Sequence, residues 1–522
     1  MNVKNQTLVI IGLLVLLTVA LRIPNTYGEI NPDSNRAKEM ANFYINEGYY
    51  SGNAHPLSIF GLYPYSYAQG VPIILATLSL VLGLDISTIS IIFPMLVGLI
   101  GLVGIMMLAS EITKDKLMQI IIAFLFITHL GFLYYSRYNL SSRGLFIALI
   151  PFYTFFLLKI KKNKAYIPLA VILFLFFILV HRIFVMIIAL TILFYVTKIV
   201  IHYIPKIKPL RIKNNQYFLI YAILCLLLFF IPFLLDLDIG LNFFQNKDVF
   251  TTITLTLATF ARMTGYLVVL IPLGVFILLI KKQKKLFEYY LLAVFLFTLP
   301  LLKSTVYIPE ILSVFYSIFI AIGVLYIIQI LKNINLKALT LFAIIFLQII
   351  IGIIFQVWQP GFIDPRQSSL DRTIDNKDLI LSEFIQKNVE ENIISDNPVE
   401  SARMSAINYC NFIYEGYTLI GCGIIDYNEF KQHIIPNNKI FHWLTSPYIL
   451  ESGSHINYYI DWLKLHRTID SKEVITLLQK YDIGYLLTND KIHNSNSQLV
   501  RSTDKQKNRI YDNGEQILFD IN

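Results

Sequence analysis

The chain has 522 residues, of which 56% are hydrophobic and only 15% are charged, and its mean hydropathy is +0.61. Soluble domains carry roughly 25% charged residues, so this composition excludes an ordinary soluble protein and indicates a chain that crosses a membrane several times. The net charge of +9 does not indicate nucleic-acid binding, because the excess of Lys and Arg is confined to residues 1–359, whereas residues 360–522 carry more acidic than basic residues.

Eleven apolar runs are long enough to cross a bilayer as helices, for which about 20 apolar residues suffice. A cleavable signal peptide is the alternative for the first run, but the many runs that follow it favour a retained helix. A further apolar stretch, residues 66–84, contains Pro72 and ends near Gly83, and we expect it to lie on the membrane surface. The predicted spans are residues 7–23, 86–110, 118–136, 141–159, 165–181, 183–203, 217–235, 258–280, 286–302, 307–331 and 337–358.

The distribution of basic residues orients these spans. With eleven spans and the N-terminus inside, the inner loops hold 18 of the 27 Lys and Arg residues of the first 359 positions, including the dense clusters at 159–164 and 281–285. A twelfth span at 66–84 would place these clusters outside, against the rule that cytoplasmic loops are the positive ones. We therefore predict a multi-pass protein of the cell membrane, with residues 24–85 and the C-terminal domain outside the cytoplasm.

Residues 360–522 are predicted to form a separate soluble α/β domain after the transmembrane domain of residues 1–359. Pro360-Gly361 opens a linker, and residues 378–390 and 471–481 have helical periodicity. Residues 483–487 read as a strand, and Asp512-Asn513-Gly514 stands between two strand-like segments, which predicts a β-hairpin.

Neither cysteines nor paired acids identify a metal site. Cys225 lies in an apolar run, and the spacing of Cys410 and Cys422 leaves open whether they form a disulfide. Asp236 and Asp238 match the D-x-D pattern of nucleotide-sugar enzymes, but two acids in an outer loop are more often simply solvated. The sequence therefore assigns no metal ligand, and it leaves a divalent metal cofactor open.

The first outer loop, residues 24–85, is the segment richest in polar chemistry. Glu29 and Asp33 follow the first span, and an amphipathic helix is predicted to begin near Ser34, because apolar residues recur with helical spacing at 37, 40, 41 and 44. Asp33 therefore stands at the mouth of a helix just above the membrane. Five tyrosines between positions 49 and 67 fit an interfacial aromatic belt better than a sugar-stacking surface.

This arrangement resembles the GT-C superfamily of membrane glycosyltransferases, which includes protein O-mannosyltransferases and lipid A aminoarabinose transferases. In that pattern an acid after the first span opens a short helix, and a glycine turn, a proline-containing stretch and a surface helix follow. The matching parts of this chain are Asp33, Gly48, His55-Pro56, Tyr63-Pro64, residues 66–84 and Tyr135-Ser136-Arg137. The resemblance covers nearly the whole chain in layout, although each motif is short.

The resemblance implies a mechanism and a partner. The donor would be a sugar on a polyprenyl phosphate, and an acceptor hydroxyl would attack its anomeric carbon while the lipid phosphate leaves. A carboxylate must deprotonate the acceptor, a role for Asp33 with Glu29 in reserve. Cations must stabilise the phosphate. The candidates on the predicted outer side are Arg137, Arg143, Arg182 and Arg262; for each, an orienting or headgroup charge is the alternative.

The chain departs from the GT-C pattern in three places. Ser34 follows Asp33 where a second acid is common, and the outer loop after the third span has Asn139 and Ser142 but no Asp. The Trp-Trp-Asp signature of oligosaccharyltransferases is missing, which argues against transfer of a whole glycan to asparagine.

Two other functions compete with sugar transfer. One is transport or flipping of a lipid-linked glycan, and the other is a non-enzymatic membrane scaffold. Transport is disfavoured because Glu111, Glu288 and Glu310 stand at span ends, whereas ion-coupled transporters usually need ionisable groups at hydrocarbon depth. The acceptor, whether protein, lipid or glycan, stays open.

Overall fold

The structure is a computed structural model of the whole chain. It describes residues 3–23, 32–50, 56–62, 68–137, 140–160, 162–203, 264–298, 308–362, 376–395, 404, 407, 412–413, 434–436, 448–450, 469, 471–489, 500, 502–504, 507–514 and 516–521. Contacts divide the chain into two compact units, each of which is described by itself. The helical unit comprises Met1–Ile23, Pro94–Arg137 and Ser142–Gln359, and the mixed unit comprises Pro24–Phe93, Tyr138–Ser141 and Pro360–Asn522.

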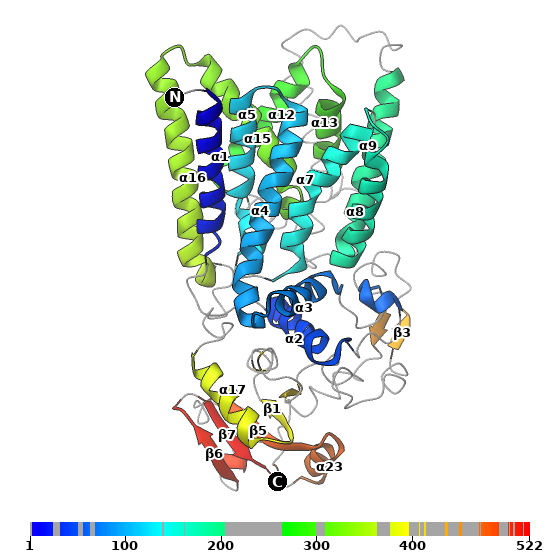
Figure 1. The fold of residues 1–522 in the computed structure, drawn as a ribbon, viewed down its shortest axis with the longest axis vertical. Helices are drawn as coiled ribbons and strands as arrows, with labels where there is room; N and C mark the ends of the chain where they lie inside the picture. Colours follow the sequence, from blue (N-terminus) through cyan, green and yellow to red (C-terminus); the bar gives the residue numbers. More distant parts are fainter. Residues whose placement is uncertain are drawn as a thin grey trace, which may run out of the picture. The chain divides into compact units, whose positions relative to one another are not determined.

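The helical unit is a bundle of mostly apolar helices (Figure 1). Its long elements are α1 (Val3–Ala20), α4 (Ile86–Ile112, which begins in the mixed unit), α5 (Lys116–Ile127), α7 (Ser142–Ile160), α8 (Tyr166–Val180), α9 (Val185–Tyr203), α12 (Leu270–Ile280), α13 (Leu286–Thr298), α15 (Ser313–Ile330) and α16 (Ile334–Phe362). Short helices complete it: α6 (Leu130–Tyr135), η2 (Arg182–Phe184), η4 (Tyr266–Val269) and α14 (Ile308–Ile311).

Five helices of the described residues are long and apolar enough to cross a membrane, namely α4, α7, η2 with α9, α15 and most of α16. Six further apolar helices are shorter. The prediction of a multi-pass helical membrane protein is thereby confirmed in outline, while the number of eleven spans and the inside N-terminus stay predictions. The predicted span at 217–235 lies outside the described residues.

Small residues let the central helices of the bundle approach closely. A Cβ on Gly274 of α12 would lie 2.7 Å from the backbone carbon of Phe319 on α15, and one on Gly323 would lie 3.0 Å from Leu270 O. Close backbone approach through glycine is the usual way in which helices associate where no hydrophobic effect drives them together. The α12–α15 pair is therefore a tightly packed part of the scaffold.

Two predicted spans of this unit are interrupted. The run predicted as one helix at 118–136 consists of α5 and α6, and the run at 307–331 consists of α14 and α15. Hydropathy registers only how apolar a segment is, whereas at the first break the side chains of Thr128 and His129 compete for the backbone hydrogen bonds. At the other end of the bundle α16 continues to Phe362, two residues past the predicted linker opening at Pro360-Gly361.

The mixed unit contains the first outer loop. Here α2 (Pro32–Glu47) packs against α3 (Gly70–Leu82), with the short helix η1 (Pro56–Ile59) between them in sequence. Ala37, Met40 and Ala41 are buried, as their helical spacing predicted. The helix α3 corresponds to the predicted surface helix, and Gly83 ends it in a left-handed conformation at φ 64°.

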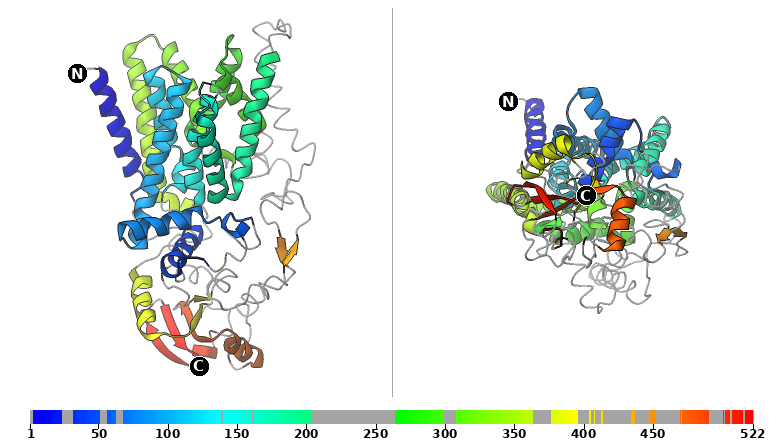
Figure 2. Two further views of the ribbon diagram at one scale, coloured as in Figure 1. Left: turned by 45° about the vertical axis from the view of Figure 1, so that its right-hand side comes forward. Right: turned by 90° about the horizontal axis from the view of Figure 1, so that it is seen from below.

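The C-terminal part of the mixed unit is an α/β fold (Figure 2). Its five-stranded sheet has the order β2-β1-β5-β7-β6, in which β1 (Asn392–Ser395) is parallel to β2 (Phe412–Ile413) and β5 (Ile483–Asn489). The last two strands, β6 (Asn508–Asp512) and β7 (Gln516–Asp520), form the predicted hairpin. The other elements are α17 (Asn376–Asn388), α23 (Lys472–Lys480) and the β3–β4 ribbon (Ile434–Pro436 and Tyr448–Leu450).

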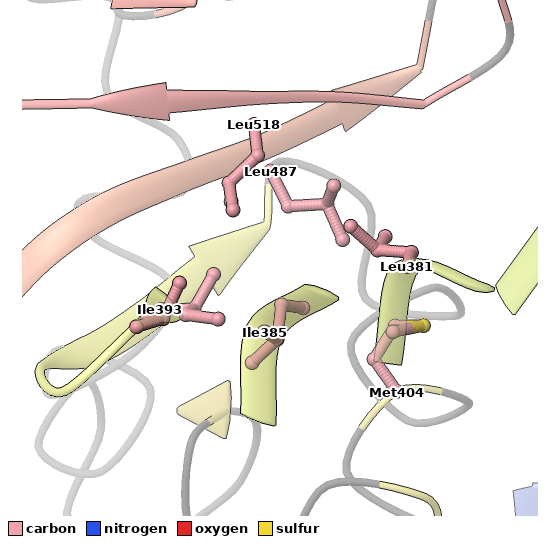
Figure 3. Packing of buried hydrophobic residues seen from close by; sticks show 7 residues of the cluster. Leu381, Ile385, Ile393, Met404, Leu487 and Leu518 are labelled. Atoms are coloured by element: carbon pink, nitrogen blue, oxygen red, sulfur yellow. The ribbon is translucent and has the colours of Figure 1, made fainter. Parts of the chain in front are cut away.

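One apolar cluster joins α17 to this sheet. Leu381 and Ile385 of α17 point toward Ile393, Leu487 and Leu518 of the strands (Figure 3). Next to the cluster, the amide of Gln516 donates a hydrogen bond of 2.7 Å to the buried carboxylate of Asp378. The predicted helix and strands of the tail are thus confirmed.

Candidate functional site

The site begins at the break between α5 and α6. Helix α5 ends at Ile127, and the Thr128 hydroxyl donates back to Phe124 O at 2.7 Å. His129 then caps α6, because its Nδ1 accepts the Gly131 N–H at 3.2 Å. A break inside an apolar bundle frees carbonyls that no water satisfies, so other groups of the protein must reach them.

Arg22 is the first of these groups. Its Nη2 donates to Ile127 O at 3.4 Å, its Nη1 to Thr18 O at 3.0 Å and its Nε to Ser136 Oγ at 2.9 Å. The guanidinium also lies over the ring of Phe132, with Cζ 4.8 Å from the centroid. Arg22 is 0% exposed, and its only partners among the described residues are these neutral groups.

Gln348 of α16 is the second group. Its Nε2 donates to Thr128 O at 2.9 Å, and the side chain is buried. Arg22 and Gln348 therefore satisfy two consecutive carbonyls at the carboxyl end of α5. A cation is favourable at this end of a helix, because the helix dipole is negative there, so the break holds Arg22 in a fixed position.

A second buried guanidinium, that of Arg137, follows α6 by two residues. Arg137 is 1% exposed and interacts electrostatically with Arg22. Two cations near each other in an apolar environment repel, and a charge buried in a membrane bundle marks a functional site by default. The pair places two guanidinium groups next to the break.

A third cation, Arg143, belongs to a small hydrogen-bonded network. Its Nη1 donates to the hydroxyl of Tyr135 at 3.0 Å, and its Cζ lies 5.0 Å from the centre of that ring. The Tyr135 hydroxyl is also hydrogen-bonded to the carboxylate of Glu310 on α14, which is buried. We call Arg22, Arg137 and Arg143 the arginine cluster; Tyr135 and Glu310 orient its third member.

Glycine brings α6 and α7 close enough for this network to form. A Cβ on Gly144, the residue after Arg143, would lie 2.8 Å from the backbone carbon of Tyr135. On the other side of Arg143, His181 lies at the end of α8 with its ring 6.2 Å from that of Phe146. His181 interacts electrostatically with Arg143 and Arg182, so both guanidinium groups lie near it.

Asp33 lies in the mixed unit, in the first turn of α2. The helix begins at Pro32 rather than near Ser34, because proline already has a helical φ and lacks an N–H that would need a partner. Asp33 is therefore the second residue of the helix, a position where a carboxylate is favoured by the dipole, and it does not precede the helix. The next residue is buried: the hydroxyl of Ser34 accepts the N–H of Leu140 at 2.9 Å, which fixes this end of α2.

No protein-family model matches the chain, and no curated protein matches it. Among solved structures, the chain is similar to the archaeal oligosaccharyltransferase AglB from Archaeoglobus fulgidus, in complex with an inhibitory peptide and a dolichol-phosphate. The two chains share 13% sequence identity, and the match covers 94% of this chain and 70% of AglB with a TM-score of 0.47. It is also similar to ArnT from Cupriavidus metallidurans, both apo and bound to undecaprenyl phosphate, with 11% and 10% identity, coverage of 100% and 99% of the two chains, and TM-scores of 0.47.

These chains share only 10–13% identity with this one, so the GT-C resemblance noted from the sequence stays a prediction. Because the TM-scores lie below 0.5, we base the function on this chain's own residues.

The structure brings together part of the predicted site. Arg137 and Arg143 lie in the arginine cluster, and Arg182 lies exposed on η2 beside His181. Glu29, Arg262 and the two acids at 236 and 238 lie outside the described residues. Within the described part of the chain, no group of three or more His, Cys, Asp or Glu is arranged to hold a metal ion.

Arg22, Gln348 and His129 are members of the site that the sequence did not predict. Arg22 read as the charge that ends the first span, and the other two read as isolated polar residues in apolar runs. One signal was available: a polar residue at hydrocarbon depth must find a partner, so each of the three could have been marked as a contact between helices.

Proposed function

We propose that the chain is a membrane glycosyltransferase that transfers a sugar from a polyprenyl-phosphate donor to an acceptor hydroxyl outside the cytoplasm. The observation that carries this proposal is the arginine cluster, in which two buried guanidinium groups, Arg22 and Arg137, lie together next to a helix break. Buried guanidinium groups suit a phosphate as a partner, and a lipid phosphate is an anion that reaches this depth while its polyprenyl chain stays in the bilayer.

The leaving group explains why the cations must be fixed in place. When the glycosidic bond breaks, negative charge grows on the phosphate oxygens, and donors already aimed at those oxygens lower the barrier most. Guanidinium groups suit this task, because they bind phosphate through paired N–H donors and stay charged. Arg22 is held by the carboxyl end of α5, and Arg143 is held by Tyr135.

The acceptor needs a base, and we assign this role to Asp33. Transfer to a hydroxyl releases a proton, and a carboxylate close to the membrane surface can take it as the bond to the anomeric carbon forms. The first turn of α2 fixes the backbone of Asp33, and Ser34 anchors that turn through Leu140. Glu29 is the reserve candidate for the same role.

The test is transfer by the purified full-length protein. Radiolabelled polyprenyl-phosphate sugars are incubated with the protein and with membrane extracts, and labelled products are separated from the donor lipid. Asp33→Asn should lower transfer by about 10²–10⁴-fold, the usual contribution of a general base. Arg137→Gln should lower it by roughly 10-fold or more, since a charge-assisted hydrogen bond contributes about 1.5–3 kcal/mol.

Two matched variants control for the substitutions themselves. Asp115→Asn changes an acid that caps the start of α5 through the Leu117 N–H, and Arg509→Gln changes an exposed arginine of the tail hairpin. Both should transfer at the wild-type rate. If Asp33→Asn and Glu29→Gln both remain fully active, the base does not lie in this loop. Movement of labelled lipid across the bilayer without bond cleavage would support a flippase instead.

A further inference from the structure

Three buried side chains near the α5–α6 break carry polar atoms that the site described above does not use. These atoms are His129 Nε2, Gln348 Oε1 and Thr264 Oγ1, and none of them has a hydrogen-bond partner in the part of the chain that the structure describes. Each residue is at most 2% exposed. Buried polar atoms in native proteins almost always have partners, so three such atoms in one region indicate a bound group. We call these three residues the hydroxyl site.

Two members of the hydroxyl site are joined directly by the break. Gln348 Nε2 donates to the carbonyl of Thr128, and His129 is the next residue along the chain. The amide of Gln348 is therefore oriented by this hydrogen bond, which leaves its oxygen as the available acceptor. Both side chains stand at the same interruption of the apolar bundle.

The third member is brought to the same place by its neighbours in sequence. The Tyr266 hydroxyl donates to Ile344 O on α16 at 2.9 Å, one helical turn before Gln348. Gly265, which has φ 80°, packs against Leu130: a Cβ added to Gly265 would lie 3.4 Å from Leu130 Cδ1. Thr264 is the residue before Gly265, so its backbone lies near the start of α6.

The chemistry of the three atoms is complementary to hydroxyl groups. Because His129 Nδ1 accepts the Gly131 N–H, the ring is neutral and carries its proton on Nε2, which is a donor. Gln348 Oε1 is an acceptor, and the Thr264 hydroxyl can do both. None of the three is charged. An alcohol both donates and accepts hydrogen bonds, so it satisfies such a set.

The location indicates which hydroxyl groups these are. Arg22 binds Ile127 O and Gln348 binds Thr128 O, so the arginine cluster and the hydroxyl site hold consecutive carbonyls of one break. In the donor, the sugar is attached directly to the phosphate. A phosphate at the arginine cluster therefore places its sugar within reach of the hydroxyl site.

We propose that the hydroxyl site binds the ring hydroxyls of the donor sugar. The inference rests on the proposed function, since it requires a lipid-phosphate sugar as donor. Ordered water offers the same hydrogen-bonding chemistry, and the experiment below separates the two sources.

The experiment measures binding of defined lipids to the purified full-length protein in detergent. The probes are polyprenyl phosphate, its mannose and glucose derivatives, and its aminoarabinose derivative. Thr264→Val removes only the hydroxyl, and His129→Asn keeps an acceptor for the Gly131 N–H while it removes the Nε2 proton. Thr197→Val is the matched control, because that buried hydroxyl donates to Leu193 O in its own helix.

Wild type should bind at least one neutral-sugar lipid more tightly than polyprenyl phosphate. Thr264→Val and His129→Asn should each weaken that binding by about 5- to 10-fold, the equivalent of one hydrogen bond, and should leave binding of polyprenyl phosphate unchanged. The control variant should bind every probe like wild type. Arg137→Gln, in contrast, should weaken all probes alike.

Several results would overturn the proposal. Unchanged sugar-dependent binding in both variants would mean that the atoms face ordered water only. If wild type binds the phosphate lipids but gains nothing from a sugar, the inference fails while the proposed function survives. If wild type binds none of the probes, the proposed function fails first and the inference fails with it.

Discussion

Gly98→Ala should displace the buried guanidinium on which the arginine cluster depends. A Cβ added to Gly98 on α4 would overlap Arg22 Nε and would lie only 2.5 Å from Cδ and 2.8 Å from Cζ. Ordinary contacts are about 3.5–4.0 Å, so Arg22 must move by about 1 Å. A shift of this size breaks the hydrogen bonds to Ser136 Oγ and Ile127 O, which are 2.9 and 3.4 Å long.

The free energy of unfolding should fall by about 2–5 kcal/mol. Each hydrogen bond from a charged donor contributes about 1.5–3 kcal/mol, and the greater helix propensity of alanine returns roughly 1 kcal/mol. The assay is unfolding of the purified protein in detergent micelles, followed by intrinsic fluorescence. Gly12→Ala is the matched control, because Gly12 is also helical and a Cβ there meets nothing within 4 Å. The control should be neutral or slightly stabilising.

A double-mutant cycle attributes the loss to Arg22. In an Arg22→Ala background the side-chain atoms that the new methyl overlaps are gone, so Gly98→Ala should cost much less there. If Gly98→Ala unfolds like Gly12→Ala, or if its cost is the same in both backgrounds, the close packing of α4 on Arg22 is wrong and the fixed position of the cation loses its support.

Three further predictions concern other parts of the chain. Gly144→Ala should destabilise the protein by more than Gly98→Ala does, because its Cβ would meet the rigid backbone of Tyr135 rather than a side chain; parallel unfolding curves would check this. In intact cells, Asn163→Cys should be shielded from an impermeant thiol reagent while Ser368→Cys reacts, and the opposite pattern would reverse the predicted topology. Hydrogen bonds from Thr88 lower the pKa of Asp85. The ionised Asp85 therefore stabilises the fold at neutral pH, and this stabilisation is lost as the pH falls through the lowered pKa. Unfolding scans should show the stabilities of wild type and Asp85→Ala converging below about pH 4.

Local elements could be predicted from the sequence where a local cause forms them. The hairpin at Asp512-Asn513-Gly514 follows from the turn residues themselves, and Gly514 has the expected positive φ of 82°. The buried face of α2 follows from its apolar spacing. In both cases the information lies within a few residues, so no distant contact was needed.

The site could be predicted only in part, because its connections are long-range. Tyr135-Ser136-Arg137 and Arg143 were found from the sequence, since a motif and charges at a span end mark them. The contacts of Arg22 join residues 105 and 114 positions apart, and Gln348 reaches a carbonyl 220 positions earlier. Hydropathy cannot reveal a helix break whose carbonyls are satisfied by partners so far along the chain.

The break between α5 and α6 also bears on how the protein assembles during synthesis. Thr128 O obtains its partner from Gln348, which a ribosome adds 220 residues later, roughly 10 to 45 seconds at ordinary elongation rates. Until then the carbonyl of Thr128 lacks this partner. Arg22 likewise cannot form its hydrogen bonds to Ile127 and Ser136 until those residues have been synthesised. A nascent chain that stalls before α16 therefore keeps the carbonyl of Thr128 without its Gln348 partner inside the bilayer, where an unsatisfied carbonyl is costly.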